Sequence, residues 1–184
     1  DAVDLASGGS TDATASSDVN DSAATSGVSI ASDIQAPTSG DIASIKIVVG
    51  SVASGDTLEI GADSVTLDGS DANGSNLTVG TITGVDYSYA ASSDTLTLTK
   101  NGGGNFTAAD VDDIVSGITF KTTATEDAGT RTFAISYVDD AGNEGTAATQ
   151  TLNVDTSAPD AVDLASGGST DATASSDVND SAAT

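Results

Sequence analysis

Apolar and polar residues alternate over many short stretches of the chain, which is the pattern of β-strands with one buried face. Clear examples are IASIKIVVG at 42–50 and TRTFAISYV at 130–138. Clusters of Gly, Asp, Asn and Ser, which favour tight turns, separate these stretches. The pattern predicts strands over residues 2–5, 27–31, 42–50, 56–61, 64–68, 76–83, 85–90, 94–100, 117–123, 130–138 and 149–154.

Strands of this length and spacing predict an all-β fold, an Ig-like antiparallel β-sandwich with Greek-key connections. The segment NFTAADVDDIVSG departs from the alternation. Its Thr107 is placed to cap a short helix, and Asp110 follows three residues later as in a capping box. We therefore expect one or two helical turns that cross from one sheet to the other. The acids Asp110, Asp112 and Asp113 are explained by their position near the helix N-terminus.

An internal repeat defines the domain organisation. The first 25 residues, DAVDLASGGSTDATASSDVNDSAAT, recur without a substitution at 160–184. The offset of 159 residues is too long for a solenoid, whose units of about 20–50 residues share one core, and it suits a string of separate domains. We interpret 1–155 as one repeat, 156–159 as a short Pro-containing linker, and 160–184 as the start of the next identical repeat.

The composition limits the possible partners. The chain carries 28 acidic residues, of which 25 are Asp, against four cations, so its formal charge is −24. Such a charge argues against binding nucleic acid and against contact with anionic lipid. The sequence has no His or Cys, and no nucleophile elbow or phosphate-binding loop. We therefore expect no enzymatic activity, no small-molecule substrate and no membrane insertion.

The run YVDDAGNEGTAATQTLNVDTSAP at 137–159 resembles the end of the Ig-like and cadherin-like repeats in giant type I-secreted RTX adhesins of Gram-negative bacteria. The segment from Phe106 to Thr123 and the Ser/Asp-rich opening resemble these repeats too. The resemblance implies an extracellular extender repeat that binds Ca²⁺ and holds a distal adhesion domain away from the cell surface. The glycine-rich nonapeptide that gives the RTX group its name is absent from this stretch.

The preference for Asp over Glu is typical of turns and of loops that bind Ca²⁺ through oxygen ligands. In an Ig-like sandwich the loops gather at two ends, and in an array the end of one repeat meets the start of the next. We therefore expect Ca²⁺ to bind at loops and at the junction with the neighbouring identical repeat, which is the expected partner. The candidate ligands are Asp1, Asp4, Asp12, Asp18, Asn20, Asp21, Glu126, Asp127, Asp139, Asp140, Asn143, Asp155, Asp160 and Asp163.

Two alternatives stay open at this point. The acids can be ordinary turn residues or part of a generally acidic, halophilic type of surface; for DGSDANGS at 68–75 a plain turn is favoured. The repeat can also be a ligand- or carbohydrate-binding module repeated for multivalency. Sugar sites usually present aromatic side chains, and only Tyr87 and Tyr89 are spaced to form such a platform, although core packing explains them as well.

Overall fold

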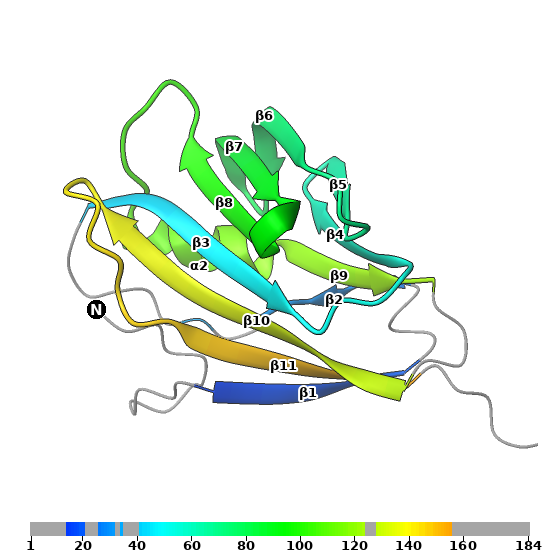
Figure 1. The fold of residues 1–184 in the computed structure, drawn as a ribbon. Coiled ribbons are helices and arrows are strands. Elements are labelled where there is room, and N and C mark those ends of the chain that lie inside the picture. Colours follow the sequence, from blue (N-terminus) through cyan, green and yellow to red (C-terminus); the bar gives the residue numbers. More distant parts are fainter. Residues whose placement is uncertain (1–13, 21–25, 32–33, 35–40, 124–127, 156–184) are drawn as a thin grey trace, which may run out of the picture.

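The computed structural model describes residues 14–20, 26–31, 34, 41–123 and 128–155, and in this part the chain forms two β-sheets packed face to face (Figure 1). The larger sheet has the strand order β1-β11-β10-β3-β8-β7-β6, and the smaller has the order β2-β9-β4-β5. The strands are β1 (Thr14–Asn20), β2 (Val28–Ser29), β3 (Ile42–Gly50), β4 (Asp56–Ile60), β5 (Asp63–Thr66), β6 (Ala72–Val79), β7 (Ile82–Ala90), β8 (Thr95–Lys100), β9 (Ile118–Thr122), β10 (Ala128–Asp139) and β11 (Ala148–Asp155).

The connections confirm the predicted antiparallel sandwich. β2, β9 and β4 are neighbours in one sheet and face β11, β10 and β3 in the other, which is the B-E-D and G-F-C order of an Ig-like Greek key. The pairs between consecutive neighbours are antiparallel, with the exception of β1, which runs parallel to β11 at the edge of the larger sheet. In the sequence, the hairpins β4–β5, β6–β7 and β7–β8 lie between β3 and β9.

Two details of the strand prediction were wrong. Residues 76–83 form no single strand, because β6 ends at Val79 and the chain reverses at Gly80 and Thr81 before β7. Apolar and polar residues keep alternating through NLTVGTIT, so the pattern gave no sign of this turn. No strand was predicted at residues 14–20, which form β1. The predicted strand at 2–5 lies outside the described residues.

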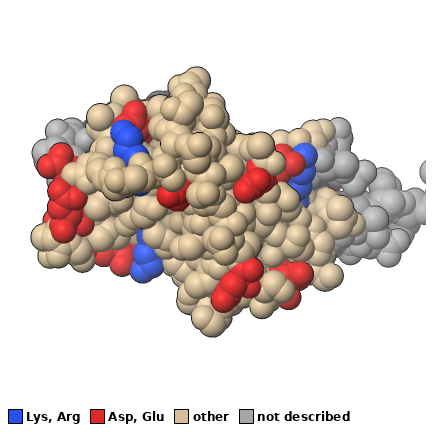
Figure 2. All heavy atoms as spheres, turned by 90° about the horizontal axis from the view of Figure 1, so that it is seen from above, with Lys and Arg blue, Asp and Glu red and all other residues tan. Residues whose placement is uncertain are grey.

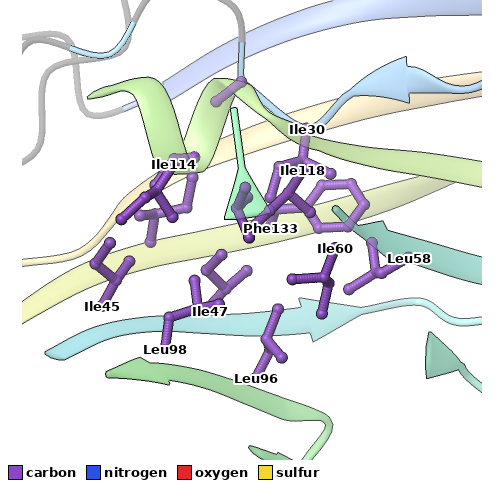
Figure 3. Close-up of a cluster of buried hydrophobic side chains, with 14 of the residues drawn as sticks. Ile30, Ile45, Ile47, Leu58, Ile60, Leu96, Leu98, Ile114, Ile118 and Phe133 are labelled. Carbon is purple, nitrogen blue, oxygen red and sulfur yellow. The ribbon is translucent and has the colours of Figure 1, made fainter. Parts of the chain in front are cut away.

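The core is a single cluster of apolar side chains from both sheets (Figure 3). Alternate residues of the central strands point into it, such as Ile45 and Ile47 of β3 and Leu96 and Leu98 of β8, all fully buried. Phe120 of the smaller sheet meets Phe133 of the larger sheet edge to face, with ring centroids 5.9 Å apart. This geometry is favoured for aromatic pairs and joins the two sheets near the middle of the core.

The predicted helix is confirmed as α2 (Ala108–Ser116), which carries the chain from β8 to β9 and so from one sheet to the other. The Thr107 side chain accepts a hydrogen bond from the Asp110 backbone N–H, and the Asp110 carboxylate accepts one from the Thr107 N–H, a complete capping box. Val111, Ile114 and Val115 form its buried face. Residues 108–116 give two and a half turns, slightly more than predicted.

Glycines permit a close contact between α2 and the turn that joins β6 to β7. A Cβ on Gly117 would lie 2.5 Å from the Gly80 nitrogen, and a Cβ on Gly80 would lie 2.5 Å from the Asp113 carbonyl oxygen. The Asp113 carboxylate accepts hydrogen bonds from the Thr81 backbone N–H and hydroxyl, which hold the pKa of Asp113 below its ordinary value. This acid therefore ties the helix to the turn.

A buried ion pair connects the two sheets beside the apolar core. Arg131 of β10 and Asp56 of β4 are 3% and 0% exposed, and the Arg131 Nε lies 2.5 Å from Asp56 Oδ2. A second guanidinium nitrogen lies 3.3 Å from Oδ1, so the contact is bidentate, and the Ala53 N–H also donates to Oδ2. Burying two charges is favourable only when both are well hydrogen-bonded, which this geometry achieves.

We predict that Asp56→Asn destabilises the fold by about 3 kcal/mol, since it leaves the buried Arg131 charge without its carboxylate partner. Glu59→Gln is the matched control. Glu59 lies on the same strand as Asp56, but it pairs with Lys121 of β9 at the surface, and surface pairs contribute about 0–1 kcal/mol to stability. Urea denaturation of both variants measures the difference. Equal effects of the two substitutions would show that the buried pair is not a special constraint.

Candidate functional site

The turn between β10 and β11 contains three of the predicted ligands, Asp139, Asp140 and Asn143. The Asp139 Oδ1 accepts hydrogen bonds from the backbone N–H groups of Ala141 and Asn143, at 2.9 and 2.8 Å, and Oδ2 accepts one from the Asn143 side chain at 2.8 Å. These hydrogen bonds hold the pKa of Asp139 below its ordinary value, and those from Asn143 make the largest contribution. Both oxygens of this carboxylate thus organise their own turn.

The neighbouring acids of this turn are engaged by other loops and strands. The Asp140 carboxylate accepts a hydrogen bond from the Asn105 side chain in the loop before α2. The Glu144 carboxylate accepts one from the Ser136 hydroxyl at 2.6 Å and pairs with Lys46 of β3 at 2.9 Å, which together lower its pKa. A cation at this end of the sandwich would have to share oxygens that already accept these hydrogen bonds.

The opposite end of the sandwich, where β11 finishes at Asp155, collects three separate segments of chain. Strand pairing places Asn20, the last residue of β1, beside Asp155, and places Asp18 beside Asn153. On the other side of β11, Asp155 pairs with Ala128, the first residue of β10. We call this end, defined by Asn20, Ala128 and Asp155, the exit end (Figure 1, right).

Sequence neighbours extend the acidic character of the exit end. Asp21 follows Asn20 directly, Asp127 precedes Ala128 directly, and Glu126 comes one residue earlier. The strand register therefore brings Asn20, Ala128 and Asp155, each next to acidic residues in the sequence or acidic itself, to one end of the larger sheet. The structure describes the backbone at Asp18 and Asn20 and the position of Asp155, whereas Asp21, Glu126 and Asp127 lie outside the described residues.

The remaining candidate ligands divide between the two ends or cannot be placed. The β10–β11 turn and the exit end are at opposite ends of β11, so the structure does not bring Asp139, Asp140 and Asn143 together with Asp155. No group of three or more acidic side chains in the described ranges is arranged to hold a metal ion. Asp1, Asp4, Asp12, Asp160 and Asp163 lie outside the described residues.

Each of the four cations lies in an ion pair with a carboxylate. Lys46 pairs with Glu144, Lys121 with Glu59, Arg131 with Asp56, and Lys100 lies 4.0 Å from Asp110. Figure 2 shows acidic side chains spread over this face of the molecule, with the visible basic side chains next to acidic ones. The excess of negative charge therefore cannot be neutralised from within the chain.

Several acids outside the predicted set stabilise turns, which sequence reasoning only partly anticipated. In DGSDANGS, Asp68 accepts a hydrogen bond from the Ser70 N–H, and Asp71 accepts one from the Ala91 N–H. The turn favoured for 68–75 is found only at 68–71, because β6 begins at Ala72. Asp86 accepts hydrogen bonds from the Asn76 backbone N–H, within the irregular part of β6, and from the Asn101 side chain in the turn after β8. These partners are distant in sequence, so no local motif identifies them.

The aromatic side chains give no support to the sugar-binding alternative. Tyr87 and Tyr89 are only 6% and 2% exposed, and the Tyr89 hydroxyl donates a hydrogen bond to Asp94. Burial raises the pKa of both hydroxyls. Their interpretation as core residues is confirmed, and they present no platform to a ligand. Tyr137 is also buried, and its hydroxyl finds no hydrogen-bond partner in the described part of the chain.

Comparison with known proteins adds no further identification: no family model matches the chain, and no curated protein matches it. Within the residues described by the structure, no helix has the length and apolar character needed to cross a membrane. The repeat, the charge and the geometry of the two ends of the sandwich are therefore the features that bear on function.

We predict that Asp139→Ala lowers the urea midpoint at pH 7, because it removes the acceptor of three hydrogen bonds that shape the turn. The pKa of Asp139 is lowered in the folded state, so its contribution is present above the unfolded pKa of about 4 and is lost as the pH falls through the lowered folded value. The difference between variant and wild type should accordingly shrink towards zero below that value.

The exposed Asp41 provides a control, since Asp41→Ala removes one surface charge without touching the turn. Denaturation series from pH 7 to about pH 2 on both variants separate the turn effect from a general charge effect. If the Asp139→Ala and Asp41→Ala midpoints changed in parallel across this range, the hydrogen bonds of the turn would not be the cause.

Proposed function

We propose that this chain is a spacer repeat of a large bacterial surface adhesin, that it has no enzymatic activity, and that Ca²⁺ stiffens it at the exit end and at the junction with the next repeat. The observation that carries the proposal is the strand register at the exit end, which brings Asn20, Ala128 and Asp155 together. The acids next to these positions in sequence supply the oxygen ligands that Ca²⁺ prefers.

The junction between repeats follows directly after this end. Only residues 156–159 separate Asp155 from Asp160, the first residue of the next copy, and Asp163 follows three positions later. At about 3.3–3.6 Å per residue, Asp160 lies within about 18 Å of Asp155 even when this segment is fully extended. Pro159 restricts the backbone of the linker and of the residue before it. Acids of two successive repeats are thus held near one another.

Electrostatics explains why a divalent cation is the expected partner. The carboxylates at the junction repel one another unless cations lie between them, and the cations of the chain are already engaged by carboxylates within the fold. Extracellular Ca²⁺ modules bind with dissociation constants of about 10⁻⁴–10⁻³ M, so millimolar external Ca²⁺ would occupy such sites. Occupied sites stabilise the folded state and fix the angle between repeats.

The exact tandem repeat supports the role as a spacer. Identical units joined by a short linker extend a chain by a constant length per unit, which suits the task of holding a distal adhesion domain away from the cell surface. The resemblance of residues 137–159 to adhesin extender repeats points in the same direction. An extracellular, cell-surface location is part of this proposal.

We predict that 5 mM CaCl₂ raises the melting temperature of the 184-residue chain by several degrees over EDTA, since a ligand at about ten times its dissociation constant adds roughly 1.4 kcal/mol. NaCl at matched ionic strength should produce a smaller shift, because it screens charge without bridging carboxylates. Scattering from a protein with several repeats should show a longer, stiffer particle in CaCl₂ than in EDTA.

Matched variants locate the effect. Asp155→Asn removes a carboxylate at the exit end and should reduce the Ca²⁺-dependent shift, whereas Asp86→Asn, four strands away from β11 in the same sheet, should retain it. Equal melting temperatures in CaCl₂ and EDTA, together with an unchanged scattering length, would refute the proposal. A shift that survives Asp155→Asn in full would place the site elsewhere.

A further inference from the structure

The first strand of the sandwich has an identical copy later in the same chain. β1 has the sequence TASSDVN at residues 14–20, and the same seven residues recur at 173–179 within the second copy of the repeat. β1 pairs in parallel with β11 along a continuous register, from Thr14 beside Thr149 to Asn20 beside Asp155. A segment identical in sequence can make the same backbone hydrogen bonds in the same register.

The position of β1 makes an exchange simple. It lies at the edge of the larger sheet, where β11 is its only partner strand among the described residues. Its replacement therefore breaks one ladder and leaves the pairing of β11 with β10 intact.

The chain is long enough for its second copy to reach this edge. To pair in the same direction, Thr173 must return from the exit end to the level of Thr149, a distance of six residues along β11, or about 20 Å. Residues 156–172 provide 17 residues, which span up to about 56–61 Å. A tethered segment of this kind has an effective local concentration of about millimolar, far above that of a separate molecule at micromolar concentration.

We propose that residues 173–179 compete with β1 for the same edge of β11, so that in a tandem array the first strand of one repeat completes the sheet of the repeat before it in a minority of molecules. Such a strand would link successive repeats through main-chain hydrogen bonds, as in β-strand addition. In either case the last residue of the added strand is an Asn opposite Asp155, and the next residue in the sequence is an Asp. The inference rests on the repeated sequence and the β11 edge, and does not depend on the Ca²⁺ proposal.

Loop length sets the expected balance between the two occupants. Residues 21–27 join β1 to β2, a connection of seven residues, whereas 17 residues join Asp155 to the second copy. Loop-closure entropy grows as (3/2)RT ln n, which favours β1 over the copy by about fourfold. Because β1 and the copy should occupy the edge in a ratio of about four to one, the copy should occupy it in about one fifth of the molecules.

Pairs of prolines in the full-length chain test this competition. Successive N–H groups of a strand point to opposite sides, so one of two adjacent prolines removes a ladder hydrogen bond in any register. The three variants are S16P/S17P, which blocks β1, S175P/S176P, which blocks the copy, and the combination of both pairs. The folding equilibrium constant from urea denaturation and the molecular mass from light scattering are measured for each.

The expected results follow from the fourfold balance. Blocking β1 alone should reduce the folding constant about fivefold, blocking the copy should leave it nearly unchanged, and blocking both should reduce it by far more than the product of the two effects. All variants should remain monomeric. A β1 block as severe as the double block would overturn the proposal, and a concentration-dependent dimer of the β1-blocked variant would show that the strand comes from a second molecule instead.

A disulfide provides an independent measurement if the proline variants fail to fold. The chain has no native cysteine, and Ser175 corresponds to Ser16, the partner of Thr151. T151C/S175C in the otherwise unchanged chain should form an intramolecular disulfide, because the bond traps the molecules in which residues 173–179 pair with β11. The control T78C/S175C, with a cysteine on β6 at the far edge of the same sheet, should not. Equal rates of disulfide formation in the two variants would refute the exchange.

Discussion

Apolar packing between the two sheets must hold this fold together against the repulsion of a large excess of acidic side chains. The core contains Ile, Val, Leu, Phe and Tyr from both layers, joined across the middle by the Phe120–Phe133 contact. The four cations are each placed in an ion pair, and the Arg131–Asp56 pair is buried between the sheets. The remaining negative charge depends on the surrounding solution for its compensation.

Strand β11 is the element on which the functional proposals converge. It pairs with β10 on one side and β1 on the other, and its last residue, Asp155, lies where both neighbours change from strand to loop. The exit end therefore gathers acid-bearing segments from distant parts of the sequence directly before the linker. The same strand offers the edge for which we propose that two identical segments compete. Both effects would couple the order of one repeat to the presence of the next.

The sequence predicted the sandwich, most strands and the helix because these depend on local signals. Alternation identified β3, β8 and β10, and the Thr107–Asp110 capping box identified α2. β1 was missed because TASSDVN has little apolar alternation, and its strand conformation is defined by backbone pairing to β11. The division between β6 and β7 was missed because apolar residues continue to alternate across Gly80.

The sequence identified acidic loops as candidate sites but not the contacts that their carboxylates make. The β10–β11 turn and the exit end lie at opposite ends of β11. The hydrogen bonds of Asp140 with Asn105 and of Asp113 with Thr81 join residues more than 30 positions apart, and only the folded chain brings them together. A high density of Asp accordingly does not reveal which carboxylates support turns and which are available to a cation.

Calorimetric titration of the 184-residue chain with CaCl₂ at physiological ionic strength tests the central claim most directly. The account predicts saturable binding with a defined stoichiometry and a dissociation constant of about 10⁻⁴–10⁻³ M. Titration of Asp155→Asn should show weaker binding or fewer sites. Weak, non-saturating heats that disappear as NaCl is raised, the same in the variant and the wild type, would indicate diffuse attraction to an acidic surface and would contradict it.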